Sequence, residues 1–395
     1  MKVLFYRYGS ICEPDLIAEF KKIGLEVDTV NDEIENKSLS PTERIDLVSK
    51  YLSKENYAFI FGINFFPSIS DLCQIYRLPY VCWIVDAPLL ELFSTSIKNA
   101  CNRIFCFDRR QYERICNYNP DCIFHLPLAT NVSRWDEEIK AINQSDIKKF
   151  SADISFIGSL YIEKDPFLEA KKLSDYTKGF IDALIASQSL IHGSGIIESA
   201  LNDTVINELK KAIPASFYDS SQLVTNTDSF IAAHHILGFH CSSLERIDIL
   251  KRLSDHFKVD LYTASSVNCF KEYPNISARG TAKTLTEMPR IFNLSKINLN
   301  MTIHPIESGA SLRIWDILGC GGFLISNYQE ELFEYLEPGV DFDYYTSVDE
   351  LIDKCQYYLD HDDIRSKIAI NGYNKVKTYH TYTNRMPTII SSIMR

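Results

Sequence analysis

Residues 308–332 read SGASLRIWDILGCGGFLISNYQEEL, and this stretch decides the fold. A glycine-containing loop opens into a helix pattern that carries Arg313 and Asp316, and Cys-Gly-Gly separates it from an apolar strand at 323–326. A helix N-terminus beside the ends of parallel strands favours an anion, because its free N–H groups and its dipole both attract negative charge. An acidic side chain on the first turns can accept hydrogen bonds from a ribose diol. The stretch therefore predicts a nucleotide-diphosphate site in an α/β protein.

The sequence on the N-terminal side of this stretch alternates strand and helix patterns in two series. Six apolar strands are expected in the first series, at 2–7, 26–30, 57–63, 79–85, 103–107 and 122–128. The second series has strands at 152–161, 259–263, 275–280, 297–302 and 323–326. Apolar strands separated by helices indicate parallel sheets covered on both faces. We therefore predict two Rossmann-like, doubly wound domains that face each other across a ligand-binding cleft.

The expected domain boundaries follow from the same patterns. Residues 1–140 form the first domain, and the polar stretch 133–150 reads as the linker. Residues 150–378 form the second domain, which carries the predicted nucleotide-diphosphate site. Within it, residues 162–232 exceed what one crossover needs and are interpreted as a helical insertion. A final helix is expected over 379–395.

Composition and charge narrow the class of protein. The chain has 395 residues, 46% of them apolar, and a net charge of −11, which argues against nucleic acid as a partner. We expect no signal peptide and no integral membrane segment, because no apolar run approaches the roughly 20 residues that span a bilayer. The 11 cysteines contain no Cys-x-x-Cys pair and are expected to be free thiols. A cytoplasmic protein is predicted.

Several residues in the second domain are candidates for binding phosphate or ribose. Each motif also has a structural alternative: a strand-to-helix turn at 157–159, a capped strand end at 279–280, and an ion pair on one helix between residues 313 and 316. Arg313 is favoured as a catalytic cation, because its planar guanidinium can neutralise a diphosphate. The candidate donor-binding residues are Gly158, Ser159, Arg279, Gly280, Ser308, Gly309, Ala310, Ser311, Arg313 and Asp316.

The first domain has a second group of candidates at its expected strand ends. Asp86 follows the strand of PYVCWIVDAP, where a carboxylate can act as a general base or orient a sugar hydroxyl. The alternative is an aspartate that begins a turn before Pro88. Aromatic side chains around a carboxylate suit a carbohydrate or another polar acceptor. The candidate acceptor-binding residues are Tyr8, Gly9, Asn64, Phe65, Trp83 and Asp86.

Other chemistries lack their sequence signatures. HHILGFHC at 234–241 has three histidines and a cysteine, but their spacing fits no zinc motif, so a strand entering a turn is expected there rather than a metal site. There is no Gly-x-Gly-x-x-Gly after the first strand, no Walker loop and no Gly-x-Ser-x-Gly elbow. A nicotinamide enzyme, a P-loop kinase and an esterase are therefore disfavoured.

The run SKINLNMTIHPIESGASLRIWDILGCGGFLISNYQEEL (295–332) resembles the C-terminal domain of CgeB-like glycosyltransferases of the spore-maturation type. ISFIGSLY (154–161), ERIDILKRLSDHFKVDLYT (245–263) and HTYTNR (380–385) match the same domain. FFPSISDLCQIYRLPYVCWIVDAPLLEL (65–92) resembles the uncharacterised domain that often precedes it. The resemblance covers nearly the whole chain.

This resemblance implies the GT-B architecture and a nucleotide-sugar donor, with no metal or other cofactor required. The donor lies on the C-terminal domain and the acceptor on the N-terminal one, and the last helix packs back on the first domain. Relatives with two glutamates seven residues apart are retaining, and by this match Asp316 binds the ribose. Ser308 stands at the first glutamate's position, beside Glu307. We therefore expect retaining transfer from a UDP-, GDP- or dTDP-sugar to a hydroxyl of a protein or glycan.

Two rival functions stay open at this point. One is a nucleotide-sugar epimerase or hydrolase of the same fold. The other is a non-catalytic module that binds a sugar nucleotide or carbohydrate without turnover. The insertion at 162–232 also offers a surface for a homo-oligomer.

Overall fold

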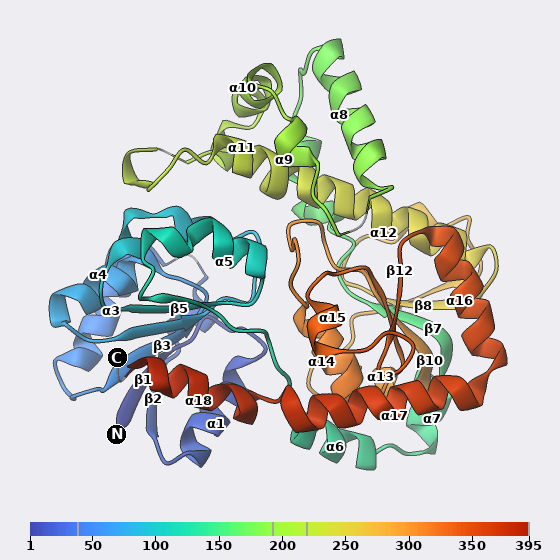
Figure 1. Cartoon of the computed structure of the whole chain (residues 1–395), viewed down its shortest axis with the longest axis horizontal. Coiled ribbons are helices and arrows are strands. Elements are labelled where there is room, and N and C mark those ends of the chain that lie inside the picture. The colour runs from blue at the N-terminus through green and yellow to red at the C-terminus, as the bar shows by residue number, and fades with distance from the viewer. Residues whose placement is uncertain (38, 192, 219, 394–395) are drawn as a thin grey trace. The chain divides into compact units, whose positions relative to one another are not determined.

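The computed structural model describes residues 1–37, 39–191, 193–218 and 220–393 (Figure 1). Contacts between residues divide the chain into two units, each built around one six-stranded parallel sheet. Unit 1 comprises Met1–Ala129, Asp219–Asn226 and His380–Arg395, and unit 2 comprises Thr130–Tyr218 and Thr227–Tyr379. The prediction of an α/β protein with two doubly wound sheets is confirmed.

The sheet of unit 1 has the strand order β2-β1-β3-β4-β5-β6. Helices α1 and α18 contact each other, as do α3 and α4, and these two pairs cover opposite faces of the sheet (Figure 1). All six expected strands are present. The elements are β1 (Lys2–Tyr6), α1 (Glu13–Lys22), β2 (Glu26–Val30), α2 (Asp32–Glu35), α3 (Pro41–Leu52), β3 (Phe59–Ile63), α4 (Pro67–Tyr76), β4 (Tyr80–Trp83), β5 (Asn102–Cys106), α5 (Arg109–Ile115), β6 (Ile123–His125) and α18 (Tyr382–Ile393).

The sheet of unit 2 has the order β12-β11-β10-β7-β8-β9. Strands β7 to β9 are added towards one edge, and strands β10 to β12 are added towards the other, so the order of the strands reverses after β9. Its strands are β7 (Ala152–Ile157), β8 (Val259–Tyr262), β9 (Ile276–Gly280), β10 (Ser295–Asn300), β11 (Leu324–Asn327) and β12 (Asp343–Tyr345). Its helices are α6 (Val132–Lys140), α7 (Gln144–Phe150), α8 (Asp175–Gln188), α9 (Ile197–Ala200), α10 (Asp203–Ala212), α11 (Asp228–Phe230), α12 (Gly238–Ser254), α13 (Met288–Leu294), α14 (Leu312–Gly319), α15 (Leu332–Tyr335), α16 (Val348–Asp360) and α17 (Asp362–Tyr379).

The stretch 308–332 forms a loop, helix α14, a tight turn and strand β11, as its pattern predicts. Gly321 ends the helix with φ +71°, a conformation that glycine adopts without a steric penalty. Gly322 is also confined: a Cβ there would lie 2.6 Å from the Phe292 carbonyl oxygen and 2.7 Å from Asn298 Nδ2. The two glycines therefore let the chain pass from helix to strand against the neighbouring backbone.

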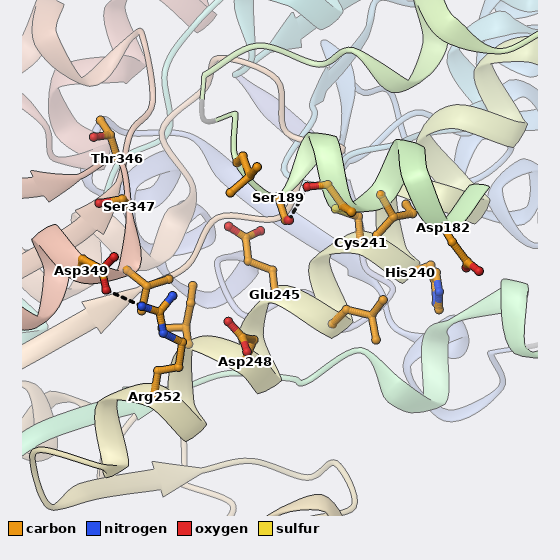
Figure 2. Close-up of a pocket in the computed structure, with 16 residues that line it drawn as sticks. Asp182, Ser189, His240, Cys241, Glu245, Asp248, Arg252, Thr346, Ser347 and Asp349 are labelled. Atoms are coloured by element: carbon orange, nitrogen blue, oxygen red, sulfur yellow. Dashed lines mark hydrogen bonds and ion pairs between the residues drawn. The ribbon is translucent and has the colours of Figure 1, made fainter. Parts of the chain in front are cut away.

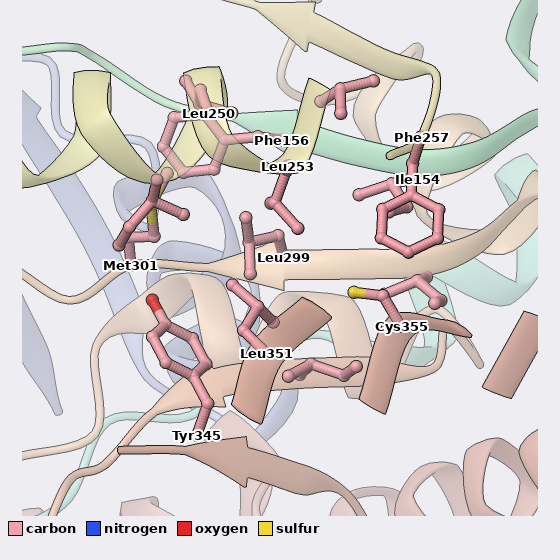
Figure 3. Close-up of a cluster of buried hydrophobic side chains, with 14 of the residues drawn as sticks. Ile154, Phe156, Leu250, Leu253, Phe257, Leu299, Met301, Tyr345, Leu351 and Cys355 are labelled. Carbon is pink, nitrogen blue, oxygen red and sulfur yellow. The ribbon is translucent and has the colours of Figure 1, made fainter. Parts of the chain in front are cut away.

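The core of unit 2 is continuous on one face of the sheet. Helices α12 and α16 pack their apolar sides on β7, β8 and β10, with Leu250, Leu253, Leu299 and Leu351 in the layer between them (Figure 3). All four leucines are almost fully buried, and burial of such a side chain contributes roughly 1.5–3 kcal/mol. This core holds α12 rigidly across the sheet.

Two sequence expectations differ from the structure. Residues 234–241 are helical, not a strand: a π-helical turn at Ile231–Leu237 continues into α12. The polar stretch 133–150 is not an extended linker, since it contains α6 and α7. Asn131 caps α6 by accepting from the Arg134 N–H at 3.1 Å, and Asn143 caps α7. Among the described residues, no helix is both long and apolar enough to cross a membrane.

Candidate functional site

The carboxyl ends of β7, β8, β10 and β11 meet at one edge of the unit 2 sheet, where open α/β sheets bind ligands. Gly158 follows β7 and donates its N–H to the Tyr262 carbonyl oxygen at 3.0 Å. Ser159 Oγ accepts from the Tyr161 N–H at 2.9 Å and lies 3.4 Å from Ser265 Oγ. The predicted pair Gly158 and Ser159 therefore stands at this edge, and the Ser159 hydroxyl shapes its own turn.

Arg246 of α12 joins two of these strand ends, although no motif marks it as a site residue. It is 9% exposed, and its guanidinium donates to the carbonyl oxygens of Ser159, at 2.5 Å, and of Met301. The Tyr161 ring lies 4.9 Å from the guanidinium carbon. Burial lowers the pKa of Arg246. A buried cation thus ties the loop after β7 to the loop after β10.

The loop 301–311 leads from β10 into α14 and is held by two polar contacts. His304 Nε2 lies 2.7 Å from Glu245 Oε2, and the His304 N–H bonds to Ser242 Oγ at 3.0 Å. Burial opposes the charged imidazolium, but Glu245 and Cys241 together outweigh it and raise the pKa of His304 to about 10. The Ser308 hydroxyl donates to Glu331 Oε1 at 2.7 Å. The Ser308 side chain is therefore buried, and its hydroxyl is already hydrogen-bonded to a carboxylate of the same chain.

A small pocket lies beside this loop, where β11 ends. Its lining includes His304, Glu307, Tyr328 and Gln329, and its volume of about 20 Å³ is enough for one water molecule. Gly193 approaches so closely that a Cβ would lie 2.2 Å from the Tyr328 ring. Residues 193–195 therefore cover the side of the loop that carries Glu307.

Helix α14 carries Arg313 and Asp316, and both side chains have partners within unit 2. Asp316 is 5% exposed, and its Oδ1 accepts from Thr130 Oγ1 at 2.7 Å. The Arg313 guanidinium carbon lies 5.4 Å from the Phe292 ring, and burial lowers the pKa of this arginine. The N–H groups of Gly309, Ala310 and Ser311 precede the helix at its N-terminus. The helix start is thus at the expected edge, with both charged side chains packed beside it.

The structure separates Arg279 from this group. Its guanidinium pairs with Asp260, Nε to Oδ2 at 3.0 Å, and lines a surface pocket with Asp153 and Lys296 near the opposite ends of the strands. Gly280 is at the expected edge, where its carbonyl accepts from the Thr263 N–H at 2.8 Å. Arg279 is therefore not retained as a candidate phosphate contact.

In unit 1, the structure brings together three of the predicted acceptor residues. Asn64 Nδ2 donates to Asp86 Oδ2 at 2.7 Å and to the Tyr8 hydroxyl oxygen at 2.9 Å. Asn64 has φ +61°, and its Oδ1 accepts from the Val85 N–H at 3.0 Å. Burial and the Asp86 carboxylate raise the pKa of Tyr8, so its phenol stays protonated. The Tyr8 hydroxyl donates to Asp86 Oδ2 over a long 3.4 Å, so the cluster offers the Asp86 carboxylate as an acceptor and a weakly engaged Tyr8 hydroxyl as a donor.

The other predicted acceptor residues have structural roles. Glu13 Oε1 accepts from the N–H groups of Tyr8, Gly9 and Ser10, at 2.9, 3.0 and 3.0 Å, which fixes the loop after β1. Gly9 adopts φ +94° in this loop. Phe65 and Trp83 are each 1% exposed and belong to the core of unit 1. Their strand-end position suggested an exposed aromatic, but the side chains point inward, and we do not retain them.

Two of the three histidines in 234–241 each lie beside a carboxylate. His234 Nε2 lies 3.0 Å from Glu198 Oε2, and His240 Nδ1 lies 2.7 Å from Asp165 Oδ2. Within the part of the chain that the structure describes, no cluster of three or more metal-ligating side chains occurs. These pairs join α12 and the turn before it to the segment 162–232.

Comparisons with known proteins place this geometry in a fold class. Residues 246–391 match the protein family described as "Glycosyl transferase-like". Over the whole chain, the glycosyltransferase from Rickettsia africae ESF-5 is similar at 11% identity, with a TM-score of 0.59 and coverage of 100% of this chain and 98% of that one. Sucrose-phosphate synthase (tll1590) from Thermosynechococcus elongatus gives 9% identity, a TM-score of 0.56 and coverage of 100% and 99%.

A third structure carries a nucleotide. Anabaena Alr3699/HepE in complex with UDP and glucose is 11% identical, with a TM-score of 0.53 and coverage of 99% of each chain. A search of curated proteins gave no match. The two parallel six-stranded sheets and these similarities show that the chain has the GT-B fold.

Proposed function

We propose that this protein is a glycosyltransferase that moves a sugar from a nucleotide-diphosphate sugar to a hydroxyl acceptor on a protein or glycan. The observation that carries the proposal is the loop 301–311 and helix α14 at the carboxyl edge of the unit 2 sheet. This segment lies within residues 246–391, which match the glycosyl transferase-like family. Solved structures of the same fold contain UDP or UDP-glucose, which favours a UDP-sugar over a GDP- or dTDP-sugar.

The donor would be held by backbone and by charge. We assign the diphosphate to Gly158, Ser159, Gly280 and the N–H groups of Gly309–Ser311, and we assign the ribose to Asp316 with Thr130 orienting its carboxylate. As the glycosidic bond breaks, the leaving diphosphate gains negative charge. Fixed N–H dipoles, with the Arg313 cation beside them, stabilise that charge more in the transition state than in the ground state. Ser308 is engaged with Glu331 and is assigned to loop structure.

The acceptor would be bound by the unit 1 cluster of Tyr8, Asn64 and Asp86. Asp86 accepts a hydrogen bond from the acceptor hydroxyl, and the protonated Tyr8 donates to a neighbouring oxygen. In retaining transfer, which the sequence resemblance implies, the leaving phosphate takes the acceptor proton and Asp86 orients the hydroxyl. In inverting transfer, Asp86 is the general base.

The first test measures donor binding. Thermal unfolding of the full chain is followed with UDP-glucose, GDP-mannose and dTDP-glucose, for the wild type and for Asp316→Asn. A ligand at 100 times its Kd adds roughly 2.7 kcal/mol of apparent stability. We expect a UDP-sugar to stabilise the wild type, Asp316→Asn to lose most of this effect, and the exposed control Asp353→Asn to keep it. No stabilisation by any of the three would contradict the donor site.

A second measurement separates transfer from the rival functions. UDP release that depends on an added glycan or protein acceptor supports a transferase. Sugar isomerisation or UDP release without acceptor would identify an epimerase or hydrolase, and binding without any turnover would identify a non-catalytic module.

A further inference from the structure

Unit 2 contains a further pocket, on α12, that the proposed transfer does not use. It lies between α8, α12 and the N-terminus of α16 and has a volume of about 430 Å³ (Figure 2). Small-molecule sites typically have volumes of about 300–1,000 Å³. The pocket is therefore large enough for a compact organic ligand.

The pocket has an apolar floor. Ile249 of α12 and Ile185 of α8 line it and are 1% and 7% exposed, and Leu244 of α12 and Val348 of α16 complete the apolar part. Leu244 is 47% exposed, so a ligand here would cover an aliphatic side chain that now faces water. Such contacts favour a ligand with an apolar body.

Negatively charged side chains outnumber positively charged ones in the lining of the pocket. Arg252 is paired with Asp349, and Glu245 is paired with His304, so these two pairs are already neutralised. Asp182 of α8 and Asp248 of α12 also line the pocket, and no ion pair involves either of them among the described residues. Two carboxylates on separate helices therefore give the pocket a negative potential.

The helix N-terminus in the pocket does not offset this charge. Ser347 caps α16 by accepting from the Glu350 N–H at 3.2 Å, and Asp349 and Glu350 stand in the first turn. Since Ser347 caps the helix and Arg252 neutralises Asp349, the carboxylates that an anion would meet here are those of Asp182 and Asp248, both of which are exposed. The electrostatics thus disfavour an anionic nucleotide and favour a cation.

We propose that this pocket binds a small organic cation, with an ammonium or guanidinium group at Asp182 or Asp248 and an aliphatic or aromatic body over Ile185, Leu244 and Ile249. A compound with two ammonium groups separated by an alkyl chain can meet both carboxylates. The proposal does not rest on the donor site at α14. Since the cation is recognised by charge on an apolar surface, it differs chemically from a nucleotide sugar.

The test is titration calorimetry of the full chain with 1,6-diaminohexane, hexylamine, hexanol and hexanoate. We expect the amines to bind and hexanol and hexanoate not to bind. The double variant Asp182→Asn/Asp248→Asn should weaken amine binding by about ten-fold, while Asp353→Asn, an exposed change elsewhere on α16, should leave it unchanged. Leu244→Trp, which fills an exposed edge of the pocket, should also abolish amine binding.

Several results would overturn the proposal. One is that the wild type binds neither amine, and another is that hexanoate binds as tightly as hexylamine. Unchanged amine affinity in the double variant would also contradict the proposal. UDP-glucose binding by the double variant, measured in parallel, should equal that of the wild type. A normal UDP-glucose response without amine binding rejects the pocket alone, and the reverse result rejects the donor site alone.

Discussion

Arg246 is the side chain that links the loops after β7 and β10. It donates to the carbonyl oxygens of Ser159 and Met301 and is 9% exposed. Replacing it with methionine keeps most of the volume but leaves two buried carbonyls without these donors. We therefore expect Arg246→Met to lower the free energy of unfolding by roughly 2–4 kcal/mol in urea denaturation.

The matched control is Arg252→Met on the same helix. Its partner Asp349 is 82% exposed and Arg252 itself 40% exposed, so solvent screens that pair. The expected loss is less than about 1 kcal/mol. Equal losses in the two variants would show that Arg246 contributes as a surface cation and does not link the loops.

His304 gives the loop before α14 a distinct pH dependence. Glu245 and Cys241 together overcome the effect of burial and raise the pKa of His304 from 6.5 to about 10. A raised pKa means that the stabilisation is complete below about pH 6.5 and is lost as the pH rises through about 10. We expect His304→Gln to cost on the order of 3 kcal/mol at pH 6 and progressively less towards pH 10.

This prediction is checked by urea denaturation of both proteins at several pH values. The difference between wild type and His304→Gln should shrink steadily between about pH 6.5 and pH 10, because the histidine of the unfolded chain loses its proton in this range while the folded protein keeps it. His256→Gln is a surface control that should show no such trend. A pH-independent difference would mean that His304 is neutral in the folded protein.

The sequence located strand-end residues better than residues on helices. Tyr8, Asn64 and Asp86 follow β1, β3 and β4, which are neighbours in the sheet, and parallel strands bring their carboxyl ends to one edge. Arg246, on a helix, and His304, in the loop after β10, escaped prediction, because the local sequence pattern does not say which polar side chain meets a distant carbonyl or carboxylate. For the same reason, Trp83 was misplaced: its strand end is at the edge, but its side chain is in the core.

At the scale of elements, apolar runs predicted the strands that lie inside each sheet. The edge strand β12 (Asp343–Tyr345) was missed, because it has three residues and no continuous apolar run. Helices α6 and α7 were missed because their surfaces are polar, although their asparagine caps are visible in the sequence. The apolar and histidine residues of the segment 234–241 pack on several sides of one helix. The sequence therefore lacks the one-sided apolar period of a surface helix, and the segment was predicted to be a strand.

Two helical glycines test how closely the helices of unit 2 pack. A Cβ at Gly372 of α17 would lie 2.3 Å from the Asp341 carbonyl oxygen and 2.8 Å from Leu318 Cδ2 of α14. A Cβ at Gly179 of α8 would meet nothing within 4 Å. We expect Gly372→Ala to destabilise the protein by about 1–3 kcal/mol. Gly179→Ala should stabilise it by roughly 0.5–1 kcal/mol, because alanine has the higher helix propensity.

Thermal and urea unfolding of both variants decide this prediction. Because the chemical change is the same, a difference in sign isolates packing from propensity. If both variants are stabilised, α17 and the loop around Asp341 are free to separate, and the contact between α14 and α17 is weaker than its geometry indicates.

At the scale of the whole molecule, the chain builds unit 1 from three separate segments. The C-terminal segment supplies α18, in which Arg385 Nε donates to the Pro127 carbonyl at 2.9 Å. Arg103 Nε in turn donates to the Ser392 carbonyl at 2.7 Å, and the Tyr382 and Trp83 rings meet edge to face. The C-terminal segment therefore completes the packing of unit 1, although residues 1–129 contain its entire sheet.

We expect a chain that ends at Tyr379 to lose the stability of unit 1 while unit 2 stays folded. Hydrogen exchange should quicken in β1–β6 and stay slow in β7–β12, and a peptide of residues 380–395 added in excess should restore protection. Two point variants refine the test within the full chain. Ile389 is fully buried, so Ile389→Ala should cost roughly 2–5 kcal/mol, whereas exposed Ser391→Ala should cost less than about 0.5. Equal protection of β1–β6 with and without the last helix would mean that unit 1 folds from its N-terminal segment alone, and α18 would then be a surface attachment.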